Sequence, residues 1–184
     1  LQHIPQKRLV VGGGYIGMEL GTVYAALGSE ITLVEAHDTI LAGADPDLIR
    51  PVMTYAKTHF KEVRLGAKVQ KLATSGKKIK VKMTVGGKSG EESYDRVLVS
   101  IGRVPNNADL GLENAGVKLE KSKVIVDDYL KTNIANIYAA GDCTGKIMLA
   151  HFAGYQGELA VENMVSHNLK KSDSRVVPNC IFTD

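Results

Sequence analysis

A glycine-rich turn between an apolar strand and a helix is the feature that most constrains the fold of this 184-residue chain. The glycines stand at Gly12, Gly14 and Gly17, directly after the apolar end of Lys7–Val11. In the segment that follows, apolar residues recur at helical spacing and lie on one face of a helix that ends at Gly28. They are Ile16, Leu20, Val23 and Leu27. This order of elements predicts an α/β fold with a parallel sheet.

The three glycines each meet a separate physical need. Gly12 allows the tight turn, Gly14 lacks the Cβ that would keep a pyrophosphate away, and Gly17 lets the helix pack close to the strand. The helix N-terminus then offers unpaired N–H groups and a partial positive charge. The turn therefore predicts a Rossmann-like dinucleotide site, the alternative being a glycine-rich turn that binds nothing.

An acidic residue ends the second strand and narrows the choice of dinucleotide. The strand Ile31–Val34 is followed by Glu35, whose carboxylate can accept both ribose hydroxyls of an adenosine and would repel a 2′-phosphate. The next residues, Ala36-His37-Asp38, contain no arginine to receive that phosphate. We therefore expect NAD rather than NADP. The alternative for Glu35 is an ordinary exposed strand end that binds no ligand.

The middle of the chain changes from helical to strand periodicity. Asp45 and Pro46 predict a helix start, with the helix reaching about Phe60, and Val63–Leu65 predicts a third strand. An antiparallel meander is expected next, with Arg96–Ile101 forming an apolar strand that ends at Gly102. The meander strands are Val69–Leu72, Ile79–Val85 and Ser93–Val99, separated by Ser75-Gly76 and by Gly86–Gly90.

The last third of the chain predicts less regular structure. Asn106–Leu119 indicates a loop, and Val124–Val126 a short strand. Asn136–Ala140 is predicted as a buried strand that stops at Gly141-Asp142, and a final helix is expected over Ala150–Ser166.

Composition excludes several function classes. The net charge is +3, and the densest basic segment, Lys77–Lys82, alternates with apolar residues, so we expect a solvated strand face and no nucleic-acid partner. The apolar runs are too short to span a membrane. Two cysteines, Cys143 and Cys180, form neither a C-x-x-C pair nor a metal pattern, which fits a reducing compartment. Because the chain starts at Leu1 and stops at Asp184, we expect a piece of a longer polypeptide.

Three segments of the chain together carry a resemblance to a known family. The first is Val11–Gly21, which contains the turn Gly12-Gly13-Gly14-Tyr15-Ile16-Gly17. The second is Ser100–Asn106, which is close to a G-R-x-P-N pattern. The third is Thr132–Asp142, followed by Met148-Leu149-Ala150-His151. With these segments the sequence resembles the flavoprotein pyridine nucleotide-disulfide oxidoreductase family, and within it the dihydrolipoamide dehydrogenases most closely.

The resemblance implies roles on the nicotinamide dinucleotide side. Tyr15 would cover the flavin's nicotinamide face until NAD binds, and Glu19 would hydrogen-bond the nicotinamide amide. Val69 would touch the adenine, and Gly102 would let the backbone approach the nicotinamide half. Arg103 has no derivable role beyond an ion pair. The alternatives are a helix-start aromatic packed on the neighbouring domain for Tyr15, a first-turn carboxylate favoured by the helix dipole for Glu19, and plain core for Val69.

The resemblance also implies a second cofactor, FAD. Asp142 would bind the ribityl chain of FAD, since it lies where a strand is expected to end. Met148, Leu149, Ala150 and His151 would lie against the flavin edge, where a donor stabilises the reduced flavin. The alternative for His151 is a helix-start histidine without a ligand.

The family's dithiol and acid–base groups are not found in this sequence. It has no C-x-x-x-x-C segment, and Cys143 is expected to be a buried neutral thiol, so we predict no catalytic residue in this chain. We expect an NAD-binding domain at 1–103, a returning FAD-domain segment at 104–178 and the start of an interface domain at 179–184. The chain should bind NADH without retaining flavin or turning over lipoamide.

Three functional hypotheses remain open at this point. The parent could be a dihydrolipoamide dehydrogenase, and then a homodimer in a 2-oxo acid dehydrogenase complex, in the cytoplasm or the mitochondrial matrix. It could be a related reductase, such as a mercuric reductase or soluble transhydrogenase, because Phe152–Gln156 lacks the family's usual charged residues. The third hypothesis is a nucleotide-binding module without catalysis.

Overall fold

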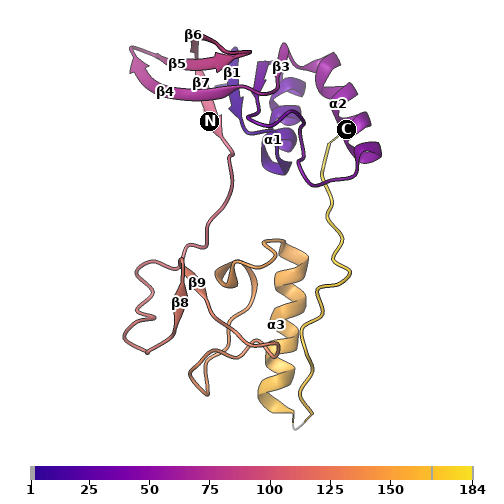
Figure 1. The fold of residues 1–184 in the computed structure, drawn as a ribbon, viewed down its shortest axis with the longest axis vertical. Coiled ribbons are helices and arrows are strands. Elements are labelled where there is room, and N and C mark those ends of the chain that lie inside the picture. Colours follow the sequence, from indigo (N-terminus) through magenta and orange to yellow (C-terminus); the bar gives the residue numbers. More distant parts are fainter. Residues whose placement is uncertain (1–2, 167, 184) are drawn as a thin grey trace. The chain divides into compact units, whose positions relative to one another are not determined.

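The computed structural model describes residues 3–166 and 168–183, which form two compact units (Figure 1). The first unit runs up to Gly102 and also takes in the residues from Ile181 onward. The second unit is Arg103–Cys180. The boundary lies beside the expected domain limit at residue 103, and the C-terminal residues return to the first unit.

A four-stranded parallel sheet forms the centre of the first unit. Its strands are β1 (Lys7–Val11), β2 (Glu30–Val34), β3 (Glu62–Arg64) and β7 (Arg96–Val99), in the order β3-β2-β1-β7. Val11 is in register with Val34 on one side and with Val99 on the other. The carboxyl ends of these strands therefore meet at one edge, and the expected α/β class with a parallel sheet is confirmed.

The helix α1 (Tyr15–Ala26) follows the turn as expected, but it buries a different face from the apolar one. Its buried residues are Gly17, Met18, Gly21 and Thr22. The expected apolar face is exposed, with Ile16, Leu20, Val23 and Leu27 between 37% and 52% accessible. The face with small residues is buried because it lets the helix pack closely on its neighbours. A Cβ on Gly21 would lie only 2.8 Å from the Phe60 ring.

The helix α2 (Pro46–His59) begins and ends close to the expected limits. Asp45 holds the N-cap position, yet its side chain makes no capping hydrogen bond. Its backbone carbonyl instead accepts the N–H groups of Leu48 at 3.0 Å and Ile49 at 3.1 Å. The two helices and the sheet share one core cluster, comprising Val10, Met18, Ile31, Leu33, Ile40, Leu41, Val52, Ala56 and Phe60.

The expected antiparallel meander is present as β4 (Lys68–Ser75), β5 (Lys78–Val85) and β6 (Lys88–Tyr94). The turn before β6 is shorter than expected, because β6 already begins at Lys88. The single strand expected over Ser93–Val99 was wrong. It breaks at Asp95, whose N–H donates to the Lys7 carbonyl at 2.9 Å and whose carboxylate accepts the Lys7 N–H at 2.8 Å. This exchange directs β7 into the parallel sheet.

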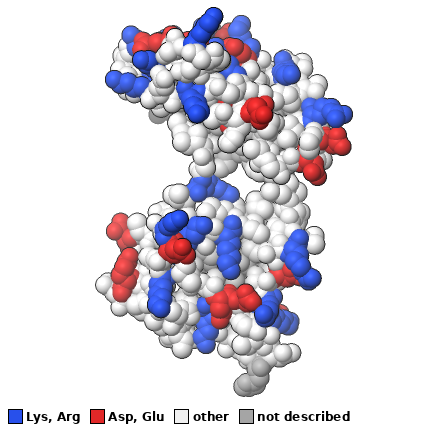
Figure 2. Space-filling view, in the orientation of Figure 1, with Lys and Arg blue, Asp and Glu red and all other residues white. Residues whose placement is uncertain are grey.

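Two lysines of the meander are paired with acidic neighbours. Lys78 Nζ lies 3.8 Å from Asp95, and Lys80 Nζ lies 3.6 Å from Glu91. Figure 2 shows basic and acidic side chains interspersed over the visible face of each unit. No helix within residues 3–166 and 168–183 is long and apolar enough to cross a membrane.

The second unit is built around α3 (Ala150–Val165), with a two-stranded pair of β8 (Leu119–Glu120) and β9 (Lys123–Val124). A 3-10 turn, η1, spans Gly141–Thr144. The strand expected over Asn136–Ala140 was wrong, because this segment pairs only through one bridge, between Lys131 and Tyr138. It therefore contributes a side chain to the local core rather than a strand to a sheet.

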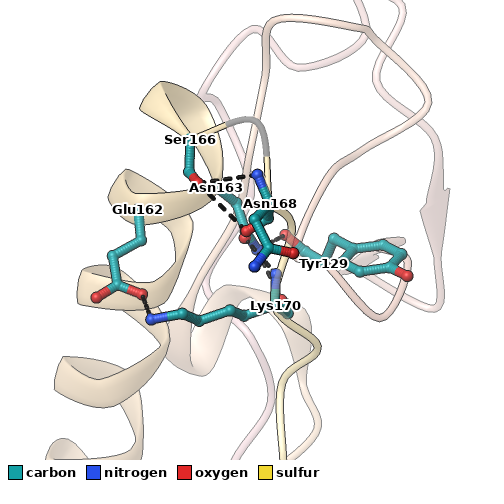
Figure 3. A network of polar contacts seen from close by, with 6 residues as sticks. All are labelled: Tyr129, Glu162, Asn163, Ser166, Asn168 and Lys170. Carbon is teal, nitrogen blue, oxygen red and sulfur yellow. Dashed lines mark hydrogen bonds and ion pairs between the residues drawn. The ribbon is translucent and has the colours of Figure 1, made fainter.

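A buried amide fixes the chain that leaves α3 (Figure 3). The Asn163 amide donates to the carbonyls of Tyr129 at 3.1 Å and Lys170 at 2.9 Å. Its oxygen accepts the Lys170 N–H at 2.8 Å, and Lys170 Nζ also pairs with Glu162 at 2.9 Å. These bonds hold the segment around Lys170 against the end of α3.

Candidate nucleotide-binding site

The glycine turn is constrained by backbone contacts at two of its positions. Gly12 has φ +105, and a Cβ there would lie 2.4 Å from the Ser100 carbonyl oxygen. A Cβ on Gly17 would lie 1.9 Å from the Gly12 carbonyl oxygen and 2.8 Å from Ser100 Oγ. Only glycine fits at either position, so the tight turn and the close helix packing have the physical causes that the sequence indicated.

Gly14 faces open space. A Cβ added there would meet no atom within 4 Å. Gly14 is also the N-cap of α1, and no described side chain caps the helix. The first N–H groups of a helix have no partner within the helix. The turn thus combines free donors, a positive dipole end and room for a phosphate group.

Glu35 lies directly beside the turn. Its Oε2 accepts the Gly13 N–H at 2.6 Å, while Oε1 accepts the His37 N–H at 2.8 Å and lies 3.1 Å from His37 Nδ1. The Glu35 side chain is 13% exposed. These bonds fix the orientation of the carboxylate at the carboxyl edge of the sheet.

Three residues that hold the turn received no role from the sequence. Ser100 Oγ donates to the carbonyls of Val11 and Gly12, each at 3.1 Å. The Leu41 N–H donates to the Gly13 carbonyl at 2.8 Å, and Leu41 itself has φ +50. Ile40 packs on Gly13. Ser100 stood inside a family segment, whereas nothing in the sequence signals the left-handed conformation of Leu41.

Glu19 and Tyr15 lie on α1, past the turn. Glu19 is the fifth helical residue, and α1 has no acidic residue in its first turn, so the helix-dipole alternative for Glu19 was wrong. Glu19 Oε1 accepts the N–H of Phe182 at 3.0 Å. Tyr15 is half-buried and packs against the core cluster of its own unit. Its alternative role, packing on a neighbouring domain, stays a prediction. Ile16 is exposed.

Two further predicted residues, Val69 and Gly102, lie on β4 and shortly after β7. Val69 is half-buried on β4 and packs on the core cluster beneath the meander, as its core alternative required. Its contact with adenine stays a prediction. Gly102 has φ +134, a conformation that L side chains rarely adopt, and a Cβ there would meet no neighbour within 4 Å.

The remaining predicted residues belong to the second unit. Arg103 Nη1 lies 3.8 Å from Asp142 Oδ2, and its Nη2 donates to the Met148 carbonyl. The expected ion pair of Arg103 is thus present, with an added bond to the backbone before α3. Leu149 is the N-cap of α3, and Ala150 is its first residue. His151 is exposed, and its Nε2 donates to the Pro178 carbonyl at 2.8 Å.

One buried side chain bonds to η1, and a half-buried thiol lies within it. The Gln156 side chain is buried, and its Oε1 accepts the Gly141 N–H at 2.8 Å, a role that the sequence did not suggest. Cys143 is half-buried, its Sγ donates to the Ala140 carbonyl at 3.2 Å, and burial raises the pKa of its thiol. The sequence predicted a buried neutral thiol beside Asp142; the thiol is only half-buried, and its raised pKa favours the neutral form.

Comparison with known sequences gives one family for nearly the whole chain. The sequence model of the family described as "Pyridine nucleotide-disulphide oxidoreductase" matches residues 1–157. Among curated relatives, a dihydrolipoyl dehydrogenase of Chlamydia muridarum is 41% identical over the full chain, and one of Vibrio parahaemolyticus is 37% identical. The chain spans 38% and 39% of the length of these two relatives.

Comparison with solved structures gives flavoprotein disulfide reductases as well. LpdA from Mycobacterium tuberculosis matches with a TM-score of 0.88 and 32% identity, over 100% of this chain and 39% of that one. The HOCl-induced flavoprotein disulfide reductase RclA from Escherichia coli matches with a TM-score of 0.84 and 26% identity, over 94% of this chain and 39% of that one.

Proposed function

The chain belongs to the pyridine nucleotide-disulphide oxidoreductase family, and on that premise we propose that it forms the NAD(H)-binding part of a dihydrolipoamide dehydrogenase. The full-length protein would oxidise dihydrolipoyl groups to lipoyl groups and reduce NAD⁺ to NADH, with FAD between them. Two relatives with the dihydrolipoyl dehydrogenase name, matched over the whole chain, support this proposal.

The proposed preference for NAD rests mainly on the contact between Glu35 and the open glycine turn. Glu35 Oε2 lies 2.6 Å from the Gly13 nitrogen. The pyrophosphate would bind at Gly14 and the first N–H groups of α1, where the structure leaves room. The Glu35 carboxylate would accept the adenosine ribose hydroxyls and repel a 2′-phosphate. Val69 would lie at the adenine.

The nicotinamide half would extend toward Tyr15, Glu19 and Gly102. Glu19 would accept a hydrogen bond from the carboxamide, and Gly102 would leave its backbone open to the ring. Tyr15 would move aside when the dinucleotide binds. These groups bind and orient NAD(H), and none of them exchanges electrons with it.

The second unit fits part of a flavin site. FAD, when bound, supplies the two-electron carrier between a dithiol and the nicotinamide. The Asp142 carboxylate is half-exposed and would accept ribityl hydroxyls, while Arg103 balances its charge. Met148, Leu149 and Ala150 would meet the flavin edge through the start of α3, and His151 would donate a hydrogen bond there.

We also propose how the chain fits into the whole protein. Residues 1–103 would be the NAD domain, 104–178 a segment of the FAD domain and 179–184 the start of an interface domain. The whole protein would be a homodimer and a component of a 2-oxo acid dehydrogenase complex, in the cytoplasm or a mitochondrial matrix. The resemblance to dihydrolipoamide dehydrogenases supports these assignments.

A flavoprotein reductase with another substrate is the second candidate. The segment Phe152–Gln156 lacks the charged residues usual in the family. Phe152 and Gln156 are both buried, so these uncharged residues contribute to the packing of α3. The similarity to RclA favours the same alternative.

A titration of the chain with NADH and NADPH, followed by ligand fluorescence, tests the proposal. We expect NADH to bind at least about tenfold more tightly, a difference of about 1.4 kcal/mol. Flavin absorbance and lipoamide turnover are expected to be absent from the purified chain. Equal or reversed affinities for the two nucleotides would exclude the assignment of Glu35.

A further inference from the structure

A residue near the C-terminus hydrogen-bonds the side chain of Glu19, the residue predicted to bind the nicotinamide. The Phe182 N–H donates to Glu19 Oε1 at 3.0 Å, across 163 positions of sequence. Both residues belong to the first unit. Among the described residues this is the one hydrogen bond found for the Glu19 side chain, so Phe182 alone fixes its direction.

The segment that brings the donor is itself anchored. Ile181 packs against the core cluster shared by α1, α2 and the parallel sheet. The Phe182 side chain, by contrast, is 80% exposed. Ile181 therefore sets where the backbone lies, and Phe182 acts through its N–H and not through its ring.

The bond leaves Glu19 free to bind a second donor. A carboxylate has two oxygens and about four acceptor positions, of which this bond uses one. A long side chain that is half-exposed otherwise samples several rotamers and loses that freedom when it binds a ligand. A backbone donor that holds the carboxylate beforehand reduces this entropic cost.

We infer that the backbone N–H of Phe182 is a positioning group for the Glu19 carboxylate and so contributes to selection of the nicotinamide carboxamide. This inference rests on the proposed function, in which Glu19 meets the nicotinamide. It adds a determinant that lies outside the glycine turn and outside α1.

The test compares two ligands in the full chain. NADH contains the nicotinamide, whereas ADP-ribose shares only the rest of the dinucleotide. Phe182→Pro removes the N–H, so it should raise the Kd for NADH about five- to tenfold and leave the Kd for ADP-ribose within about twofold. Val176→Pro, at a 91% exposed position of the same C-terminal segment, is the matched proline control and should change neither.

Phe182→Ala separates the backbone from the side chain, because it keeps the N–H. If it lowers NADH affinity as much as Phe182→Pro does, the ring is responsible and the inference is wrong. A loss of both ligands in Phe182→Pro, or a loss of neither, also overturns it. If the wild-type chain binds neither ligand, the proposed function fails first, which is a distinguishable result.

Discussion

Gly14 and Gly17 lie three residues apart in one turn, yet a methyl group added at each would meet different surroundings. At Gly17 the group would overlap the Gly12 carbonyl oxygen, 1.9 Å away, and at Gly14 it would meet open space. Gly14 also has an ordinary φ of −77. The fold therefore requires a glycine at position 17 but not at position 14, where the proposed ligand would require it.

Gly17→Ala should therefore destabilise the chain, by about 3 kcal/mol, since the backbone must shift to admit the methyl group. Gly14→Ala should leave the melting temperature within about 2 °C, because nothing in the fold opposes it. It should still weaken NADH binding about tenfold or more by filling the pyrophosphate space. Thermal melts and NADH titrations of both variants check this. Unchanged NADH affinity in Gly14→Ala would place the pyrophosphate elsewhere.

Glu35→Gln tests charge separately from hydrogen bonding. The glutamine oxygen can still accept the Gly13 N–H, but the charge that repels a 2′-phosphate is gone. We expect the preference for NADH over NADPH to fall about tenfold, read from the two Kd values. Glu30→Gln, at the exposed far end of β2, is the control and should keep the wild-type ratio.

Among the elements, the parallel sheet and the meander are joined by one charged cluster. Arg64 at the end of β3 pairs with Glu62 at 2.6 Å and with Glu92 of β6 at 2.7 Å. Tyr94 donates to the other Glu92 oxygen at 2.7 Å. Burial alone would raise the pKa of Glu92, but the hydrogen bonds from Arg64 and Tyr94 outweigh it, and the pKa lies below its ordinary value.

Arg64→Met should lower stability by about 1–2 kcal/mol at pH 7. A carboxyl group with a depressed pKa in the folded state stabilises the fold fully above its unfolded pKa, and this stabilisation is lost as the pH falls through the folded value. The difference in melting temperature between wild type and Arg64→Met should therefore narrow below about pH 4. Arg50→Met, which removes an exposed pair with Asp47, should have little effect at any pH. A constant difference from pH 7 to pH 3 would contradict this assignment.

Elements whose limits depend on local chemistry could be predicted from the sequence. The strand before Gly12, the helix after it and the proline at the start of α2 all follow from steric rules that apply within a few residues. For the same reason the glycine turn and Glu35 were found together, because a strand, turn and helix in this order place them at one sheet edge.

Features decided by packing between distant segments could not be predicted in this way. Periodicity identified α1, but the buried face was selected by backbone distance, which favours Gly17 and Gly21 over the apolar face. The break at Asp95 depends on bonds to Lys7, 88 positions away. The contact of Glu19 with Phe182 spans most of the chain and has no local signal.

At the scale of the whole molecule, the two units have very different cores. In the described part of the chain, the first unit has two buried apolar clusters, of nine and six residues. The second has one cluster of three, namely Leu130, Leu159 and Ala160. Because stability from burial grows with the apolar area removed from water, the second unit should unfold at the lower temperature.

Calorimetry with and without NADH tests both the difference in stability between the units and the location of the nucleotide site. A ligand at 100 times its Kd stabilises the unit that binds it by about 2.7 kcal/mol. Since Gly14, Glu35 and Glu19 all belong to the first unit, NADH should raise the upper transition by about 10 °C and leave the lower one in place. ADP-ribose at the same concentration as NADH should shift the same transition by less, because it lacks the nicotinamide that Glu19 would bind. A shift of the lower transition would instead mean that Arg103–Cys180 takes part in holding NADH, and the assignment of the site to the first unit would have to be abandoned.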